Sequence, residues 1–149
     1  MTQLTEHISL EDMLHSESGE RLGIDNTPDA VALENLHLIA SVMEVIRLRL
    51  GCPLVIYSGY RSTAVNAVVG GVATSAHCHG LACDFVFPEY GSPYMVAIAI
   101  TPWIKELCVD QLIREYGWIH VGLAVAVAPR NELLTKRSAA AKYELGILA

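Results

Sequence analysis

The chain has 149 residues, of which 52% are hydrophobic and 17% charged, and its formal net charge is −6. This length and composition predict a single domain over residues 1–149 with enough apolar side chains for a packed core. The negative charge argues against a nucleic-acid partner, because nucleic-acid-binding surfaces are normally basic.

Targeting signals are missing from the sequence as given. No stretch is long and apolar enough to predict a transmembrane segment, and the N-terminus lacks the basic and apolar regions of a secretory signal. We therefore expect synthesis in the cytoplasm. The four cysteines form no C-x-x-C pair, so we expect reduced thiols. Cys78 and Cys83 are close in sequence to the ionisable residues His77 and Asp84. We expect each cysteine to be either a small buried side chain or a metal ligand.

The N-terminal third predicts two helices. Ser9 is expected to cap a short helix over residues 10–14. Thr27 is expected to cap a long helix whose first position is Pro28 and which ends just before Gly51. Apolar residues at spacings of three and four predict one buried stripe along this helix: Ala32, Leu36, Ile39, Met43, Ile46 and Leu50.

The central part predicts short elements. Residues 54–58 are expected to form a buried strand, 63–69 a short helix and 81–87 a second strand. Serine or threonine followed by proline, at Pro93 and at Pro102, predicts two helical segments that meet near the second proline.

The C-terminal part predicts strands over residues 111–115 and 118–123, joined by a hairpin turn at Tyr116-Gly117. Residues 132–135 suggest a last strand, and 137–148 either a helix or an ordered tail. This order predicts an α+β domain with a mainly antiparallel sheet and helices packed on one side.

Three ionisable residues stand out: His77, Asp84 and His120. Asp84 lies within the apolar run 81–87, and His120 lies between two aliphatic residues; buried ionisable groups need a partner or a metal. If the two strands pair, both side chains can converge on one ion. Two imidazoles and one carboxylate suit Zn²⁺ with an open fourth position, which favours metal-assisted hydrolysis. The alternative is that His77 and His79 are polar loop residues, Asp84 is a turn carboxylate and His120 is a hydrogen-bonded core histidine.

Two motifs resemble peptidase family M15, the zinc D-alanyl-D-alanine carboxypeptidases: His77-x-x-Gly80-x-Ala82-x-Asp84 and Trp118-Ile119-His120. The similarity is greatest to the phage and prophage branch of peptidoglycan-cutting enzymes. It extends from about residue 10 to residue 123, with support from 58–62, 65–71 and 110–113. The resemblance implies a Hedgehog-like α+β fold and one zinc ion held by His77, Asp84 and His120.

The resemblance also implies roles for nearby polar residues. Arg61 matches a family arginine, which implies both a binding and a catalytic role: its guanidinium can hold a substrate carboxylate or carbonyl and polarise it. The alternative is a surface arginine in a turn. Ser75 either hydrogen-bonds substrate or caps the loop. Relatives often have an acidic residue three positions before the last histidine, where this chain has Gly117. Glu115 is therefore the candidate general base, unless it faces solvent, and His79 is a second candidate.

The predicted function is a zinc metallopeptidase that cleaves the peptide stem of peptidoglycan, as a carboxypeptidase or an endopeptidase. It would be a phage or prophage lysis enzyme (an endolysin) that reaches the cell wall after release. One alternative is a virion-associated or structural module that keeps the fold and the zinc with little activity; another is a metal-free interaction domain. The basic residues between positions 130 and 149 either approach an anionic envelope or form a solvated helix face.

Overall fold

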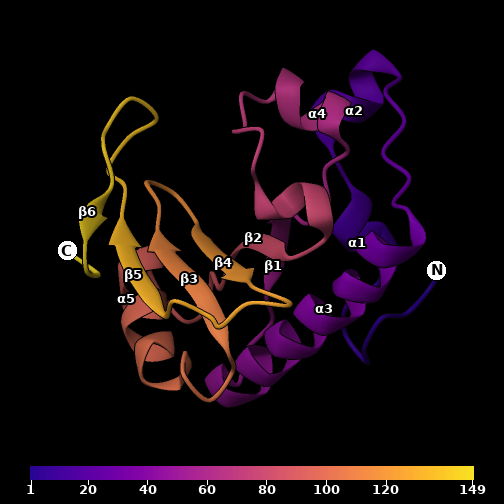
Figure 1. Cartoon of the computed structure of the whole chain (residues 1–149). Helices are drawn as coiled ribbons and strands as arrows, with labels where there is room; N and C mark the ends of the chain where they lie inside the picture. The colour runs from indigo at the N-terminus through magenta and orange to yellow at the C-terminus, as the bar shows by residue number, and fades with distance from the viewer. The chain divides into compact units, whose positions relative to one another are not determined.

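The computed structural model describes residues 1–149 as a mixed α+β protein with a six-stranded sheet (Figure 1). The helices are α1 (Leu10–Leu14), α2 (Glu17–Leu22), α3 (Ala30–Leu50), α4 (Thr63–Val68) and α5 (Pro93–Ile100), with short 3₁₀ turns η1 (Ala76–His79) and η2 (Thr101–Trp103). The strands are β1 (Val55–Ser58), β2 (Ala82–Val86), β3 (Val109–Arg114), β4 (Ile119–Leu123), β5 (Glu132–Thr135) and β6 (Glu144–Leu145). This architecture confirms the predicted fold class.

The chain divides into two compact units. The first unit comprises residues 1–44 and 56–83, and the second comprises residues 45–55 and 84–149. Strands β1 and β2 contribute residues to both units, and the strand order of the sheet is β1-β2-β4-β3-β5-β6.

The first unit begins with two capped helices. Ser9 caps α1 as expected: its hydroxyl accepts from the Asp12 N–H at 3.1 Å, and the Asp12 carboxylate accepts from the Ser9 N–H at 3.0 Å. Helix α2, which the sequence analysis missed, has the same kind of start, because the Ser16 hydroxyl accepts from the Gly19 N–H at 3.2 Å. A six-residue helix contains too few apolar positions to show a periodic pattern.

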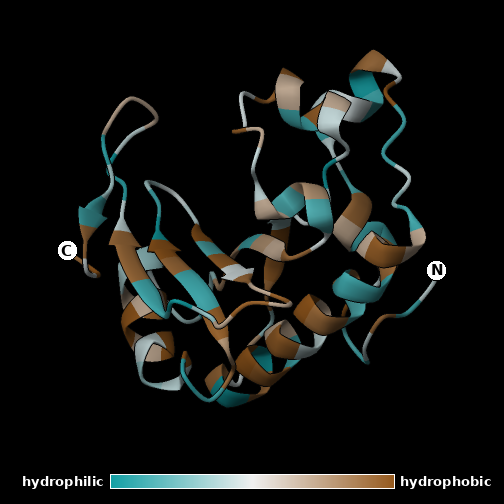
Figure 2. Cartoon of the chain, in the orientation of Figure 1, coloured by the Kyte–Doolittle hydropathy of each residue, from teal (hydrophilic) through white to brown (hydrophobic).

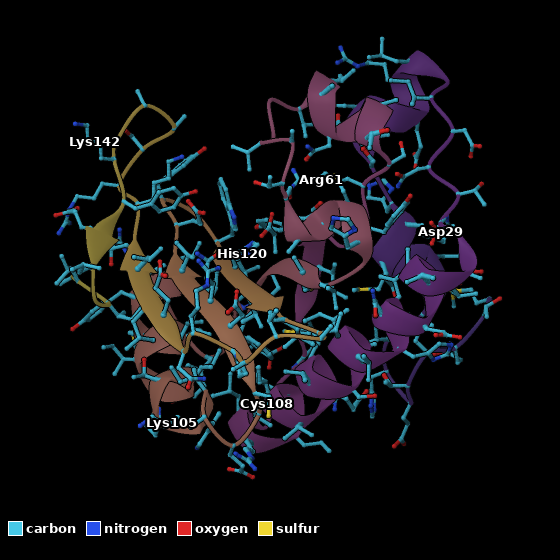
Figure 3. The ribbon with its side chains drawn as sticks, viewed as in Figure 1. Asp29, Arg61, Lys105, Cys108, His120 and Lys142 are labelled. Atoms are coloured by element: carbon cyan, nitrogen blue, oxygen red, sulfur yellow. The ribbon has the colours of Figure 1, made fainter.

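The start of α3 differs from the prediction. The helix begins at Ala30, and Asp29, labelled in Figure 3, is its cap: the carboxylate accepts from the Ala32 N–H at 2.7 Å. Thr27 instead donates its hydroxyl hydrogen to Asp25 at 2.6 Å, which closes a turn before the helix. The prediction of Thr27 as cap and Pro28 as first helical residue was therefore wrong by two positions.

The buried stripe of α3 is confirmed. Five of the six predicted positions are at most 4% exposed, and only Leu50 is half-buried. Figure 2 shows the helix apolar over most of its length, broken by short polar bands. The helix ends before Gly51, as predicted, where φ is +70°. Despite its 21 residues, α3 does not combine the length and apolarity of a membrane span, and no other helix does.

The second unit contains the predicted hairpin. Strands β3 and β4 pair antiparallel, with Ile113 opposite His120, and the Glu115 N–H donates to the Trp118 carbonyl at 3.0 Å across the turn. Strand β5 lies on the other side of β3 and runs parallel to it, and β6 pairs antiparallel with β5. Helix α5 packs against β3 and β4. The sheet is therefore mixed, with one parallel pair among these strands.

One local prediction needs correction, and one pair of alternatives is decided. Strand β1 is not buried, because Val55 and Tyr57 are 46% and 53% exposed. It is the first strand of the sheet order, so it has a strand neighbour on one side only. The segment 137–148 contains no helix; it forms turns and the two-residue strand β6. The basic residues there consequently do not form a helix face.

Candidate metal centre

His77 is held in a defined orientation by the first unit. It lies in η1, whose first turn is capped by Ser75: the hydroxyl accepts from the His77 N–H at 3.3 Å. The His77 ring is 2% exposed, and its Nδ1 lies 2.6 Å from the Gly59 carbonyl oxygen. Because a carbonyl only accepts, Nδ1 carries the hydrogen, and Nε2 of the neutral ring is the basic nitrogen. Metal-binding histidines are commonly fixed in this way.

The end of η1 is fixed against α3. Gly80 has φ +68°, and a Cβ at this position would lie 2.4 Å from the Ala32 carbonyl oxygen. Only glycine satisfies both the left-handed conformation and this close approach. The Asn35 amide also donates to the His79 carbonyl at 2.9 Å. The backbone that carries His77 is therefore held from both ends.

Arg61 lies between β1 and α4 (Figure 3), in a segment that the Asn26 side chain organises. The Asn26 amide donates to the carbonyls of Leu14 and Tyr60 at 2.7 and 3.2 Å and accepts from the Ser62 N–H at 2.7 Å. The Arg61 N–H donates to the His77 carbonyl at 3.1 Å. Arg61 is thereby tied to the histidine turn through its backbone.

The Arg61 guanidinium also acts electrostatically on this turn. Burial raises the pKa of the Cys78 thiol, and the positive charge of Arg61 offsets part of that increase. Cys78 is adjacent to His77, so the positive charge of Arg61 reaches the region of the first candidate ligand. Arg61, Ser75 and His77 thus belong to one local structure.

Asp84 and His120 meet in the second unit. They project from β2 and β4, which are neighbours in the sheet, and His120 Nδ1 lies 2.8 Å from Asp84 Oδ1. Both side chains are 14% exposed, so the pair is largely shielded from water. The condition stated for the two ionisable groups to meet, that their strands pair, is met in the structure.

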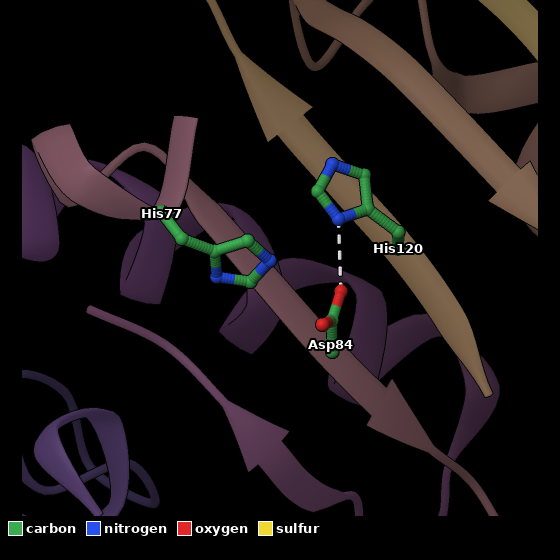
Figure 4. Close-up of side chains that lie close together, drawn as sticks. All are labelled: His77, Asp84 and His120. Atoms are coloured by element: carbon green, nitrogen blue, oxygen red, sulfur yellow. Dashed lines mark hydrogen bonds and ion pairs between the residues drawn. The ribbon is translucent and has the colours of Figure 1, made fainter. Parts of the chain in front are cut away.

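The three candidate ligands form a group that can hold a metal ion. His77, Asp84 and His120 each offer one ligand atom, and these atoms all lie within 4.8 Å of one another (Figure 4). Donor atoms around a tetrahedral zinc ion lie about 3.4 Å apart, for bonds of 2.0–2.1 Å. The donor set fits zinc in chemistry, and the spacing requires only small side-chain movements.

Glu115 occupies the same face of the sheet as His120. Ile113 pairs with His120, and Glu115, two residues further along, lies opposite Trp118. Side chains two apart on a strand share a face, so Glu115 and His120 are diagonal neighbours. Glu115 is only 8% exposed, so its side chain does not face solvent, which was the alternative.

The surroundings of Glu115 act on the pKa of its carboxyl group. Burial raises the pKa of the Glu115 carboxyl above its usual value, and the negative charge of Asp84 raises it further. His120 and Lys136 act in the opposite direction. A buried carboxyl with a raised pKa is typical of groups that accept and return protons.

The other candidates have plainer environments. His79 is exposed. None of the four cysteines forms a disulfide in the structure. Sequence reasoning missed Asn26 and the Gly59 carbonyl as supports of the site, since a backbone acceptor and a loop amide carry no motif signal.

The comparison with protein families bears on this geometry. The family model for Peptidase M15 matches residues 6–122, a span that contains His77, Asp84, Glu115 and His120. No curated protein matches the chain.

Proposed function

Because the chain belongs to the peptidase M15 family, we propose that it is a zinc-dependent peptidase that cleaves the peptide stem of bacterial peptidoglycan. The observation that carries the proposal is the group of His77, Asp84 and His120, whose ligand atoms lie within 4.8 Å of one another. In a chain of this family, such a group supports metal-assisted peptide hydrolysis more than any other function.

The three residues would hold the zinc ion with His77 Nε2, the Asp84 carboxylate and a ring nitrogen of His120. Three protein ligands leave a coordination position for water or substrate, as catalytic zinc sites do. A zinc ion bound here would supply Lewis acidity, which polarises a peptide carbonyl and acidifies a water molecule.

Glu115 is the proposed general base. Its buried carboxylate would accept a proton from the attacking water and return it to the amine of the leaving peptide. The chain has Gly117 at the position where relatives often carry an acid, so Glu115 would replace that residue from the other strand of the hairpin.

Arg61 and Ser75 are proposed to bind substrate. The guanidinium can hold a carbonyl or carboxylate oxygen and balance the negative charge that develops during hydrolysis. The Ser75 hydroxyl already accepts from the His77 N–H, and its own hydrogen remains available for donation to a substrate oxygen.

A role in phage or prophage lysis extends this proposal, with action on the cell wall after release. Its support is the resemblance of the two ligand motifs to that branch of the family. The alternative is a virion-associated module of the same fold with little activity. Metal binding alone does not separate the two functions, so the test must measure cleavage.

The decisive experiment incubates the purified protein with peptidoglycan and zinc, with and without a chelator, and analyses the released products by mass spectrometry. Release of D-alanine or stem peptides that the chelator abolishes supports the peptidase. Bound zinc without release would support the structural module instead. His120→Ala should remove both zinc and cleavage, whereas His37→Ala, an exposed histidine on α3, should change neither.

A second experiment tests the base. Glu115→Gln should keep zinc and lower kcat by roughly 10²–10⁴-fold. His79→Ala should leave kcat close to that of the wild type. If His79→Ala abolishes turnover and Glu115→Gln does not, the assignment of the base is wrong.

A further inference from the structure

Beyond residue 122, where the family match ends, the residue that follows strand β5 adds a positive charge to the face that carries His120 and Glu115. Ile113 pairs with Leu134 in parallel register and with His120 in antiparallel register, so these three side chains share one face. Lys136, two residues after Leu134, belongs to that face as well, and its N–H donates to the Arg114 carbonyl at 2.9 Å.

The Lys136 side chain is placed by an aromatic ring. Its Nζ lies 4.8 Å from the centre of the Tyr143 ring, at cation–π distance. The nearby carboxylate of Glu144 is engaged elsewhere, since it accepts from Arg137 at 2.8 Å. Glu144 also pairs with Thr135, which places it on the opposite face. Lys136 takes part in none of the ion pairs of this region.

The charge of Lys136 reaches the candidate general base. It is one of the two positive groups that lower the pKa of Glu115 against the larger effect of burial. Lys136 is half-buried and Glu115 is buried. An ammonium that is partly open to solvent and close to the base is available to an anionic group of a bound molecule.

We propose that Lys136 binds the free terminal carboxylate of the substrate peptide, with Tyr143 positioning its side chain. The inference rests on the proposed peptidase function and specifies its substrate: a short peptide with a free C-terminus close to the scissile bond. Such a residue favours carboxypeptidase over endopeptidase cleavage. With the carboxylate on Lys136, Arg61 is left to bind a carbonyl oxygen.

The chemistry of lysine suits this role. Its ammonium is a compact charge with three donors, which binds one carboxylate group without the planar alignment that arginine requires. A half-buried ammonium discriminates between a peptide acid and the corresponding amide, because hydrogen bonds between charged groups are stronger than those between neutral groups.

The test compares two peptides with the same stem sequence ending in D-Ala-D-Ala, one with a free C-terminus and one with a C-terminal amide. For the zinc-loaded wild type, kcat/KM should be about tenfold or more higher for the acid, mainly through KM. Lys136→Met should reduce this preference to less than about twofold, and Lys136→Arg should retain most of it. Lys142→Met, an exposed lysine on the loop before β6, is the matched control (Figure 3).

Failure of the proposed function can be distinguished from failure of this inference. If the zinc-loaded protein cleaves neither peptide, the peptidase proposal fails. Calorimetry then measures the dissociation constants of the acid and of the amide, and their ratio gives the preference for the free carboxylate. In either measurement, loss of the preference in Lys136→Met supports the carboxylate subsite. An unchanged preference in Lys136→Met, or no preference in the wild type, overturns it. Circular dichroism confirms that each variant is folded.

Discussion

Substitution of Gly80 tests how tightly the turn carrying His77 is fixed. Two costs are expected for Gly80→Ala. A left-handed backbone at a residue with Cβ costs about 1–2 kcal/mol. The new Cβ would also lie 2.4 Å from the Ala32 carbonyl oxygen, a backbone atom that cannot rotate away. Displacing packed structure of this kind costs about 1–3 kcal/mol more, so the free energy of unfolding should fall by roughly 2–5 kcal/mol in total.

Gly23→Ala is the matched control. Gly23 also follows a helix with φ +65°, but a Cβ there would meet nothing within 4 Å. In Gly23→Ala the free energy of unfolding should therefore fall only by the backbone cost of about 1–2 kcal/mol. Effects on the unfolded chain are common to both substitutions and cancel in the difference.

Urea unfolding followed by circular dichroism measures both variants against the wild type. The difference between them should be about 1–3 kcal/mol, and zinc affinity should fall for Gly80→Ala alone because its turn carries His77. Equal stability of the two variants would refute the argument, since it would mean that the contact with α3 contributes nothing to the position of the turn.

Three further predictions concern supports of the fold and of the site. Asp29→Ala should lower the free energy of unfolding by about 1 kcal/mol through loss of the α3 cap, measured in urea. Gly59→Ala should weaken zinc binding by roughly 10–100-fold in titration calorimetry, because a Cβ would lie 2.5 Å from the Met13 carbonyl oxygen and move the carbonyl that orients His77. Hydrogen bonds from Arg130 lower the pKa of Asp110, so this pair should stabilise the fold above the unfolded pKa of the carboxyl and lose that contribution as pH falls through the folded pKa. Asp110→Asn should therefore cost about 1 kcal/mol at pH 7 and almost nothing near pH 2, measured by urea unfolding at both values.

Much of the fold could be predicted from the sequence because its signals are local. The stripe of α3, the cap at Ser9 and the hairpin turn each depend on residues within a few positions of one another. The start of α3 could not be located in the same way. Thr27-Pro28 and Asp29 are both good start signals, and the bond from Thr27 to Asp25 decides between them.

The candidate site was predictable in part. Asp84 and His120 were recognisable because an ionisable group within an apolar strand is costly unless it has a partner. Their convergence on one ion required only the assumption that the strands carrying Asp84 and His120 are neighbours in the sheet. The supports of His77 were not recognisable, since the Gly59 carbonyl acts through the backbone. Lys136 was visible only as one of several basic residues near the C-terminus, because its face depends on the parallel register of β5.

Anomalous diffraction at the zinc edge, from crystals of the zinc-loaded protein, tests the central claim most directly. One peak is expected per chain, at about 2.0–2.2 Å from a nitrogen of His77, an oxygen of Asp84 and a nitrogen of His120. A zinc peak bound elsewhere, or none at this group under saturating zinc, would contradict the assignment of the metal centre and the peptidase function built on it.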